Sequence, residues 1–220
     1  MQYDTLCLTN IDCHALEMPQ LGRADRLGSS HAMEPKQLKV LFVCTGNVCR
    51  SPTAAAIFRR KLREAGFDDV IVADSAGTSE AHVGQTPDIR AQLACKKRGL
   101  DISQHRARAV DPSDFETADL ILAMDWEVLT ELQQRSPAAY RHKIQLLMRY
   151  ANDFDEAVVP DPYYGLNEGF NIVLDYCTDA CEGLIEELEK KAKQLQREKA
   201  AYLAEHPEAA PAVEESQADQ

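Results

Sequence analysis

The sequence predicts an α/β fold in which helices cover both faces of a four-stranded parallel sheet, forming a three-layer sandwich. Short apolar runs over residues 41–43, 70–73, 120–124 and 144–148 alternate with stretches of helical periodicity. Such strand–helix alternation produces a parallel sheet with helices on both of its faces. The first run is apolar at consecutive positions, which is typical of a strand that is buried on both faces.

The first strand leads into a tight loop that opens a helix. Gly46 and Asn47 adopt positive φ angles more readily than most residues, so the chain can curl back there. Ser51 is a favourable N-cap and Pro52 a favourable first helical residue. Because backbone N–H groups at a helix N-terminus attract anions, this loop is a candidate anion site even before its side chains are considered.

Two side chains give the loop its chemical character. Cys44 begins the loop, and N–H donors around a thiol at a helix start stabilise the thiolate, which is a nucleophile. Arg50 ends the loop, and a guanidinium can hold two oxygens of a phosphate. Ser51 could donate its hydroxyl to the thiolate. A lone cysteine is more often a buried apolar residue, but this combination indicates attack on a phosphate monoester.

The elements that follow the loop begin with a helix over residues 51–66. This helix has one apolar face, and Gly66 can adopt the left-handed conformation of a C-terminal cap. The second strand, over residues 70–73, comes next. A loop over residues 74–79 is expected to follow that strand.

A second helix is predicted over residues 87–98, with Leu93 and Ala94 directed inward. The third strand is followed by a helix over residues 126–134. The last helix begins near Glu168. Its apolar stripe consists of Phe170, Val173, Leu174, Cys177, Cys181, Leu184, Ile185 and Leu188.

The chain divides into three regions. Residues 1–37 are predicted to be a disordered N-terminal extension or leader, because polar residues and glycines break up any periodicity. Residues 38–189 form the folded domain. Residues 190–220 form a helical extension and then, from residue 201, a disordered acidic tail with five acids and no lysine or arginine.

Composition excludes several kinds of partner. The net charge is −12, from 36 acidic and 24 basic residues, which argues against binding to nucleic acid or to an anionic membrane surface. No apolar run approaches the length of a membrane span, so no membrane association is expected. Seven cysteines at irregular spacing favour a reducing, cytoplasmic environment over a disulfide framework.

Two motifs in the sequence resemble those of a known family. The loop is similar to the signature loop of the low-molecular-weight protein tyrosine phosphatases, and Val43 stands where the larger tyrosine phosphatases carry a histidine. A second motif lies far downstream, where the family places its general acid. The resemblance extends from about Lys39 to about Leu188. The two motifs are Cys44-Thr45-Gly46-Asn47-Val48-Cys49-Arg50-Ser51 and Asp161-Pro162-Tyr163-Tyr164-Gly165.

The resemblance implies a flavodoxin-like fold of the phosphotyrosine phosphatase I type. It also implies hydrolysis of phosphotyrosine monoesters through a phosphocysteine intermediate. Cys44 would be the nucleophile, Arg50 with the loop amides would bind phosphate, and Asp161 would act first as acid and then as base. The resemblance implies no metal and no other cofactor.

Further residues match supporting positions of the family. Ser75 and His105 correspond to residues that hold the loop asparagine, Asn47. Asp125 corresponds to an aspartate close to the signature arginine. The resemblance therefore implies that these side chains stabilise the loop and do not react with substrate.

The substrate slot departs from the family at one position. Tyr163 and Tyr164 would form one wall of a deep slot that admits a phenyl phosphate, and the depth would favour phosphotyrosine over phosphoserine. Ala81 occupies a place that usually carries an aromatic wall residue. His82 is expected to replace that wall in part.

The resemblance also implies partners. Substrates would be tyrosine-phosphorylated proteins, among them a bacterial tyrosine kinase, and the enzyme would be a monomer or a weak dimer. The spacing of Cys44 and Cys49 suggests in addition that oxidised Cys44 forms a disulfide with Cys49, which would resist irreversible oxidation.

Three alternatives remain open at this point. Protein arginine phosphatases on the same fold tend to carry threonine at the position of Val48 and a shorter Asp-Pro-Phe-Gly motif. A thiol-coupled arsenate reductase needs a further cysteine pair near the middle of the chain, where only Cys95 lies. A non-catalytic phosphotyrosine-binding module would not require Cys44, Arg50 and Asp161 together.

Overall fold

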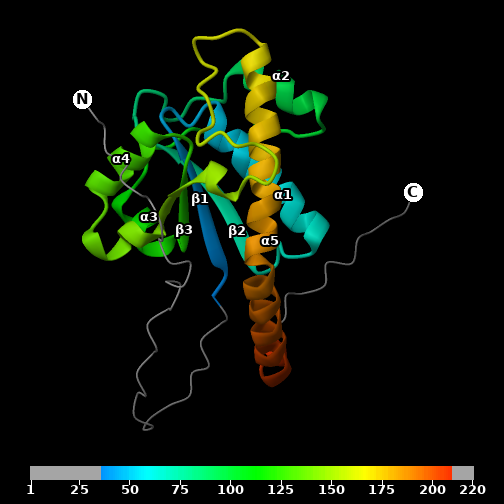
Figure 1. Ribbon diagram of the computed structural model, residues 1–220. Coiled ribbons are helices and arrows are strands. Elements are labelled where there is room, and N and C mark those ends of the chain that lie inside the picture. Colours follow the sequence, from blue (N-terminus) through cyan, green and yellow to red (C-terminus); the bar gives the residue numbers. More distant parts are fainter. Residues whose placement is uncertain (1–35, 210–220) are drawn as a thin grey trace, which may run out of the picture. The chain divides into compact units, whose positions relative to one another are not determined.

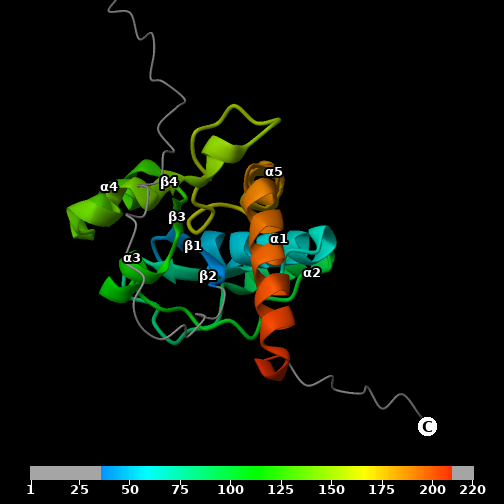
Figure 2. The same cartoon turned by 90° about the horizontal axis from the view of Figure 1, so that it is seen from below.

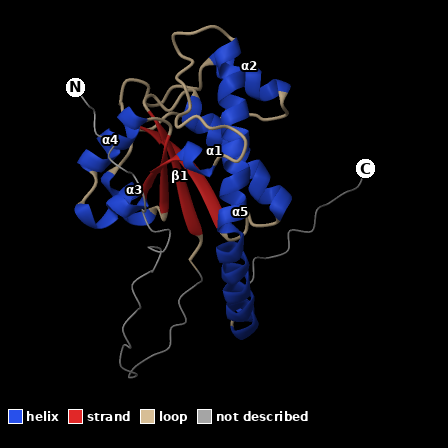
Figure 3. Cartoon of the chain, in the orientation of Figure 1, coloured by secondary structure: helices blue, strands red, loops and turns tan. Residues whose placement is uncertain are grey.

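The computed structural model describes residues 36–209 and contains the predicted four-stranded sheet. The strands lie side by side in one sheet (Figure 3), in which each pair of neighbouring strands is parallel and the order is β2-β1-β3-β4 (Figure 2). The chain changes direction across the sheet next to β1, and α/β sheets bind ligands at the carboxyl ends of strands beside such a point. The strands are β1 Leu38–Cys44, β2 Ile71–Gly77, β3 Leu120–Ala123 and β4 Ile144–Leu146.

Helices cover both faces of the sheet, which confirms the predicted three-layer arrangement (Figures 1 and 2). The helices α1 Arg50–Ala65, α2 Ile89–Lys97 and α5 Glu168–Glu205 share one core with the sheet. The helices α3 Pro112–Thr117 and α4 Trp126–Arg135 share the other. The described residues also include three short 3₁₀ helices, which are η1 Ala138–Lys143, η2 Leu147–Tyr150 and η3 Pro207–Ala209.

Strand β1 contributes to both cores, as its consecutive apolar residues predicted. Val40 and Phe42 point into the core that contains α1 and α5, and the Phe42 ring meets Phe58 of α1 edge-on at 5.5 Å. Leu41 and Val43 point into the core that contains α3 and α4. Burial on both faces fixes β1 in the centre of the sheet, so the position of the loop that follows it is well defined.

Strand β2 is longer than the sequence predicted. Residues 74–77 were expected to lie in a loop, but they continue the strand and pair with residues 41–44 of β1, so Ser75 lies opposite Phe42. The end of β2 comes very close to the anion loop. A Cβ atom on Gly77 would lie 2.7 Å from the carbonyl oxygen of Thr45, so only glycine permits this approach.

The buried face of α2 also differs from the prediction. Leu93 is 54% exposed, and the helix packs through Ala91, Ala94 and Cys95, which lie three and four positions apart on one face. Helix α3 was not predicted, although its capping box, formed by Asp111 and Asp114, is a readable start signal.

Strand β4 ends two residues earlier than expected. The sequence predicted a strand over residues 144–148, but the 3₁₀ turn η2 begins at Leu147. Tyr150 at the end of this turn packs closely against α5: a Cβ atom on Gly183 would overlap the Tyr150 carbonyl oxygen. The short turn η2 and the glycine at position 183 together allow α5 to lie against this part of the chain.

Helix α5 begins at Glu168 as expected and continues to Glu205. Because η3 follows α5, the prediction of a disordered tail from residue 201 was wrong for residues 201–209. The extension is anchored, since Gln196 donates to the Gly66 carbonyl at 2.6 Å and Lys199 pairs with Asp69 at 3.1 Å. The predictions for residues 1–35 and 210–220 lie outside the described residues. Within residues 36–209, none of the helices combines the length and the apolar composition that a membrane crossing requires.

Candidate active site

The loop between β1 and α1 surrounds the sulfur of Cys44 with hydrogen-bond partners. The Asn47 N–H donates to Cys44 Sγ at 3.2 Å, and Ser51 Oγ lies 3.0 Å from the same sulfur. Cys44 is the last residue of β1, and Arg50 is the first residue of α1. The sulfur thus lies at the carboxyl end of a central strand and at the N-terminal end of a helix, where negative charge is stabilised.

Asn47 holds the shape of this loop. It is fully buried and has a φ of 54°, in the left-handed region, and it is the only non-glycine residue with positive φ in the described part of the chain. Its Nδ2 donates to Ser51 Oγ at 2.9 Å and to Ser75 Oγ at 3.0 Å. Its Oδ1 accepts from His105 Nε2 at 3.0 Å and from the Arg108 N–H at 2.9 Å. All four hydrogen-bonding positions of the amide are therefore used.

The hydroxyl of Ser51 has one proton and two acceptors for it. Because Asn47 Nδ2 donates to Ser51 Oγ, the Ser51 proton is directed either to Cys44 Sγ at 3.0 Å or to the Ala76 carbonyl at 3.2 Å. A negative charge on the sulfur would draw this proton toward Cys44. Ser51 can therefore stabilise Cys44 as a thiolate.

Arg50 is buried at the other end of the loop and lies between two carboxylates. Its Nη1 donates to Asp125 at 2.5 Å, and its Nη2 pairs with Asp161 at 2.9 Å. Nη1 also donates to the Val159 carbonyl at 3.2 Å. Burial acts to lower the pKa of Arg50, but the negative charges at Cys44, Asp161 and Asp125 outweigh it and the pKa is raised. The guanidinium is thus held charged and oriented beside the sulfur.

The two carboxylates differ in their surroundings. Asp125 is the N-cap of α4, and its second oxygen accepts from the Val128 N–H at 2.8 Å. Both of its carboxylate oxygens are therefore held by hydrogen bonds. The Asp161 side chain is 45% exposed, and its second oxygen accepts from the Tyr163 N–H at 3.0 Å. Asp161 is consequently the carboxylate that is free to meet both Arg50 and a ligand.

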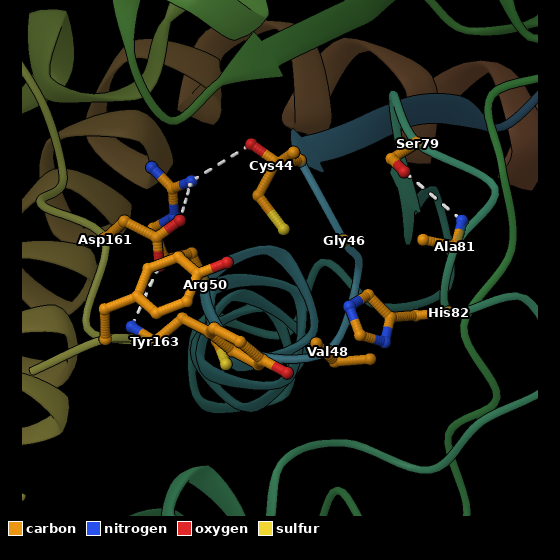
Figure 4. Close-up of a pocket in the computed structure, with 12 residues that line it drawn as sticks. Cys44, Gly46, Val48, Arg50, Ser79, Ala81, His82, Asp161 and Tyr163 are labelled. Carbon is orange, nitrogen blue, oxygen red and sulfur yellow. Dashed lines mark hydrogen bonds and ion pairs between the residues drawn. The ribbon is translucent and has the colours of Figure 1, made fainter.

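A cavity of about 130 Å³ lies over the sulfur. Figure 4 shows Cys44 and Arg50 at its base and Asp161, Tyr163 and His82 around it. The His82 and Tyr163 rings have centroids 5.9 Å apart, and Tyr163 meets Tyr164 edge-on at 5.0 Å. The remaining lining residues are Thr45, Gly46, Val48, Cys49, Ser79, Ala81 and Tyr164.

Two titratable groups near the loop are shifted by burial. Burial, reinforced by the negative charges of Asp88 and Cys44, strongly raises the pKa of the Cys49 thiol, which keeps Cys49 protonated. Burial lowers the pKa of His105. Because His105 Nε2 faces the Asn47 Oδ1 acceptor, the neutral imidazole carries its proton on Nε2. His105 therefore contacts the loop asparagine and does not face the cavity.

The structure brings together every residue that the sequence singled out for the site, and it adds others. Arg108 is one of these, because its backbone N–H donates to Asn47 at 2.9 Å; within the predicted loop, Thr45 Oγ1 accepts from Arg50 at 3.4 Å. Arg90 was missed altogether, although it reaches the segment that carries Asp161. Its Nη2 donates to the Tyr163 carbonyl at 2.9 Å. No local pattern indicated this role, because the partner is 73 positions away.

Comparison with known proteins agrees with this geometry. A family model described as low molecular weight phosphotyrosine protein phosphatase matches residues 39–195. The chain belongs to this family. It is a protein tyrosine phosphatase by homology, as the sequence predicted, and the flavodoxin-like fold is shared with solved members of the family.

Two relatives illustrate the family match. A Synechocystis protein, provisionally named a low molecular weight protein-tyrosine-phosphatase, is 46% identical over 155 residues, which is 70% of this chain and 98% of the relative. The low molecular weight phosphotyrosine protein phosphatase of Rattus norvegicus is 40% identical over 149 residues, which is 67% of this chain and 93% of the relative.

Two solved structures are similar as well. A protein tyrosine phosphatase from Entamoeba histolytica with Hepes in its active site has a TM-score of 0.69 and 40% identity, covering 70% of this chain and 99% of that one. The structure of a Drosophila arginine phosphatase has a TM-score of 0.64 and 34% identity, covering 68% of this chain and 97% of that one. The fold thus includes proteins named for two different phosphorylated side chains.

Proposed function

We propose that this phosphatase hydrolyses phosphotyrosine in proteins through a phosphocysteine intermediate on Cys44. The observation that carries the proposal is the convergence of Cys44, Arg50 and Asp161 on one cavity of about 130 Å³. A nucleophile and a cation at the two ends of one loop, together with a proton donor from a distant segment, are the groups that phosphoryl transfer to sulfur requires.

In the first step the Cys44 sulfur attacks phosphorus, and the bond from phosphorus to the phenolic oxygen breaks. Asp161, in its protonated form, gives its proton to the departing oxygen. Arg50 and the loop N–H groups stabilise the charge on the other three phosphate oxygens. Phosphate competes with Asp161 for Arg50 Nη2, now 2.9 Å from the carboxylate, so substrate binding itself frees Asp161 for the leaving group.

In the second step a water molecule attacks the phosphocysteine. Asp161, now a carboxylate, takes a proton from this water, the sulfur–phosphorus bond breaks, and inorganic phosphate leaves. Ser51, 3.0 Å from the sulfur, donates its hydroxyl to the thiolate as it departs. No metal or other cofactor takes part in this scheme, since the protein groups supply each proton and charge.

Three further residues position this machinery in the proposal. Ser75 and His105 fix Asn47, which donates its N–H to the sulfur at 3.2 Å. Asp125 orients Arg50 at 2.5 Å. These contacts support roles in shaping the loop, because none of the three side chains lines the cavity.

The walls of the cavity support an aryl phosphate as substrate. Tyr163 on one side and His82 on the other form a slot over Cys44, and Tyr164, which is 97% exposed, lies at its rim. A phosphotyrosine ring fills such a slot while its phosphate reaches the sulfur, whereas a phosphoserine side chain is too short. The His82 ring lies beside Gly46, where an added Cβ atom would be 2.9 Å from the imidazole. This position supports the expectation that His82 replaces in part the aromatic wall that is missing at Ala81.

The partners and setting follow from this chemistry. Substrates are tyrosine-phosphorylated proteins, of which a bacterial tyrosine kinase is one, and the enzyme acts as a monomer or weak dimer in the cytoplasm. A free Cys44 is needed for turnover, and the five cysteines within residues 36–209 are all unpaired, which suits a reducing compartment. Residues 38–189 form the phosphatase domain of this proposal.

A protein arginine phosphatase is the second candidate, because one similar structure carries that name. Val48 and the Tyr163 ring give this chain an apolar, aromatic slot, which favours a phenyl ring over a guanidinium. The arsenate reductase alternative is weaker, since Cys95 is fully buried and packs against Thr53. A binding module without turnover does not account for Asp161 at the cavity.

The test is hydrolysis of phosphotyrosine and phosphoarginine peptides in EDTA by the wild type, Cys44→Ser and Asp161→Asn. We expect phosphotyrosine turnover that is lost in Cys44→Ser and reduced about a hundredfold in Asp161→Asn. Preference for phosphoarginine would support the second candidate. Absence of turnover with both peptides would overturn the catalytic proposal.

We also propose that Cys49 protects the nucleophile from oxidation. Cys49 is five positions from Cys44 in the same loop and lines the same cavity. A sulfenic acid on Cys44 would condense with the Cys49 thiol, losing water and forming a disulfide that a thiol reductant reverses. Mass spectrometry after peroxide treatment should find this disulfide. Sulfonate on Cys44 without the disulfide would contradict the proposal.

A further inference from the structure

A second cavity adjoins the one over Cys44. It has a volume of about 260 Å³ and shares three lining residues with the first, namely Val48, His82 and Tyr163. Figure 4 shows these three side chains around the catalytic cavity, with Val48 between Tyr163 and His82. We call the second cavity the flanking groove. Its other lining residues are Gln85, Thr86, Asp88, Ile89 and Arg90.

The charged groups of the flanking groove are already paired with each other. Arg90 holds the two carboxylate oxygens of Asp88 at 3.0 and 2.7 Å, and these hydrogen bonds lower the pKa of Asp88. The other Arg90 donors reach the carbonyl oxygens of Tyr163 and Gly165. Among its lining residues, the groove therefore offers a ligand neither a free cation nor a free carboxylate.

The rest of the lining is apolar or uncharged. Ile89 is the first residue of α2 and is 64% exposed, so its side chain presents aliphatic surface to a ligand. Val48 and the Tyr163 ring add apolar surface beside it. His82 Nδ1 lies 2.9 Å from Gln85 Oε1, which orients the imidazole. These surfaces suit an apolar side chain better than a charged one.

We propose that the flanking groove binds an apolar side chain next to the phosphotyrosine of the protein substrate. Consecutive Cα atoms in a peptide are about 3.8 Å apart, so neighbouring side chains can occupy two cavities that share a wall. With the phosphotyrosine ring between His82 and Tyr163, the adjacent residue passes over that wall into the groove. The inference rests on the proposed function and names the sequence context of its substrate.

The test uses phosphotyrosine peptides that differ only in one residue, either directly before or directly after the phosphotyrosine. Leucine, alanine and glutamate are compared at each position, and p-nitrophenyl phosphate is the reference without a flanking residue. At one of the two positions we expect kcat/KM for the leucine peptide to exceed that for the glutamate peptide about tenfold.

Variants at Ile89 test whether the preference for leucine arises in the flanking groove. Ile89→Ser should reduce the advantage of leucine to below about twofold and leave p-nitrophenyl phosphate hydrolysis unchanged. Ile89→Lys should reverse the preference in favour of glutamate, a gain that impaired folding cannot produce. Leu93→Ser is the matched control, since Leu93 is an exposed aliphatic residue on the next turn of α2 that lines neither cavity.

The outcomes separate this inference from the proposed function. If an active wild-type enzyme hydrolyses the leucine and glutamate peptides equally well at both positions, the proposal for the flanking groove is overturned and the proposed function is not. A leucine preference that survives in Ile89→Ser, or that disappears equally in Leu93→Ser, would overturn it too. Failure to hydrolyse p-nitrophenyl phosphate and all phosphotyrosine peptides would instead overturn the proposed function, and the inference with it.

Discussion

The guanidinium of Arg90 donates to the carbonyl oxygen of Tyr163 at 2.9 Å, two residues after Asp161. The same group pairs with Asp88, the N-cap of α2, and lies 4.7 Å from the centre of the Phe170 ring. The segment that carries Asp161 is thus fastened to the start of α2 and to α5. Arg90 does not line the catalytic cavity, so it acts through the position of Asp161.

Arg90→Ala should impair proton donation by Asp161. Small displacements of a catalytic group reduce rates strongly, and we expect kcat/KM with phenyl phosphate, which reports the first step, to fall about tenfold. The loss with p-nitrophenyl phosphate should be smaller, because its leaving group needs less help from an acid. Arg98→Ala is the control, since Arg98 follows the same helix and makes an exposed ion pair with Asp175. Equal losses with both substrates would contradict a role in positioning the acid.

Asp125→Asn should weaken phosphate binding while preserving the helix cap. The new side chain can still accept from the Val128 N–H but no longer carries the charge that holds Arg50 at 2.5 Å. We expect inhibition by inorganic phosphate to weaken about tenfold, with the free energy of unfolding changed by less than about 1 kcal/mol. Asp111→Asn, at the N-cap of α3, is the matched control. Unchanged phosphate inhibition in Asp125→Asn would refute the prediction.

His105 should make the protein less stable in mild acid. Burial lowers its pKa in the folded state below the ordinary value of 6.5, so the unfolded chain binds more protons as the pH falls through that value. The free energy of unfolding should therefore decrease below about pH 6.5. His105→Gln keeps an N–H donor for Asn47 but cannot titrate. Urea denaturation between pH 7.5 and pH 5 should show that the free energy of unfolding falls less steeply in this variant than in the wild type. If the two proteins lose the same free energy over this pH range, His105 makes no contribution.

Gly183→Ala should destabilise the fold by about 3 kcal/mol. The added methyl group would overlap the carbonyl oxygen of Tyr150, and neither backbone can move without disturbing the core that contains α5. Gly169→Ala in the first turn of the same helix is the control, because its Cβ would lie 3.2 Å from a Pro162 side-chain atom. The midpoint of thermal unfolding is measured for both variants. Similar midpoints for the two would show that the contact at Gly183 is relaxed in solution.

Much of the site could be predicted from the sequence because its parts are local. Cys44 and Arg50 belong to one loop, and the turn and cap residues between them show that the loop joins a strand to a helix. The apolar run of β1 is also a local signal, and it indicated a central strand. Asp161 needed the family resemblance, since an Asp-Pro pair alone is a common turn.

The remaining features depend on contacts between distant segments. Residues 75–77 are small and have low strand propensity, yet pairing with β1 makes them a strand. Leu93 faces outward because α2 packs through alanine and cysteine, which a reading based on large apolar residues overlooks. The Arg90 contacts join segments whose separation in the sequence carries no local signal. Tertiary packing decided each of these cases.

Asn47 has a consequence for the thermodynamics of ligand binding. Its amide is satisfied entirely by protein groups, so the strained curl of the loop is maintained by the fold and does not wait for an anion. The entropy lost in ordering the loop is then part of the folding equilibrium. An arriving phosphate meets a rigid receptor and retains the full benefit of its contacts, as expected of a preorganised site.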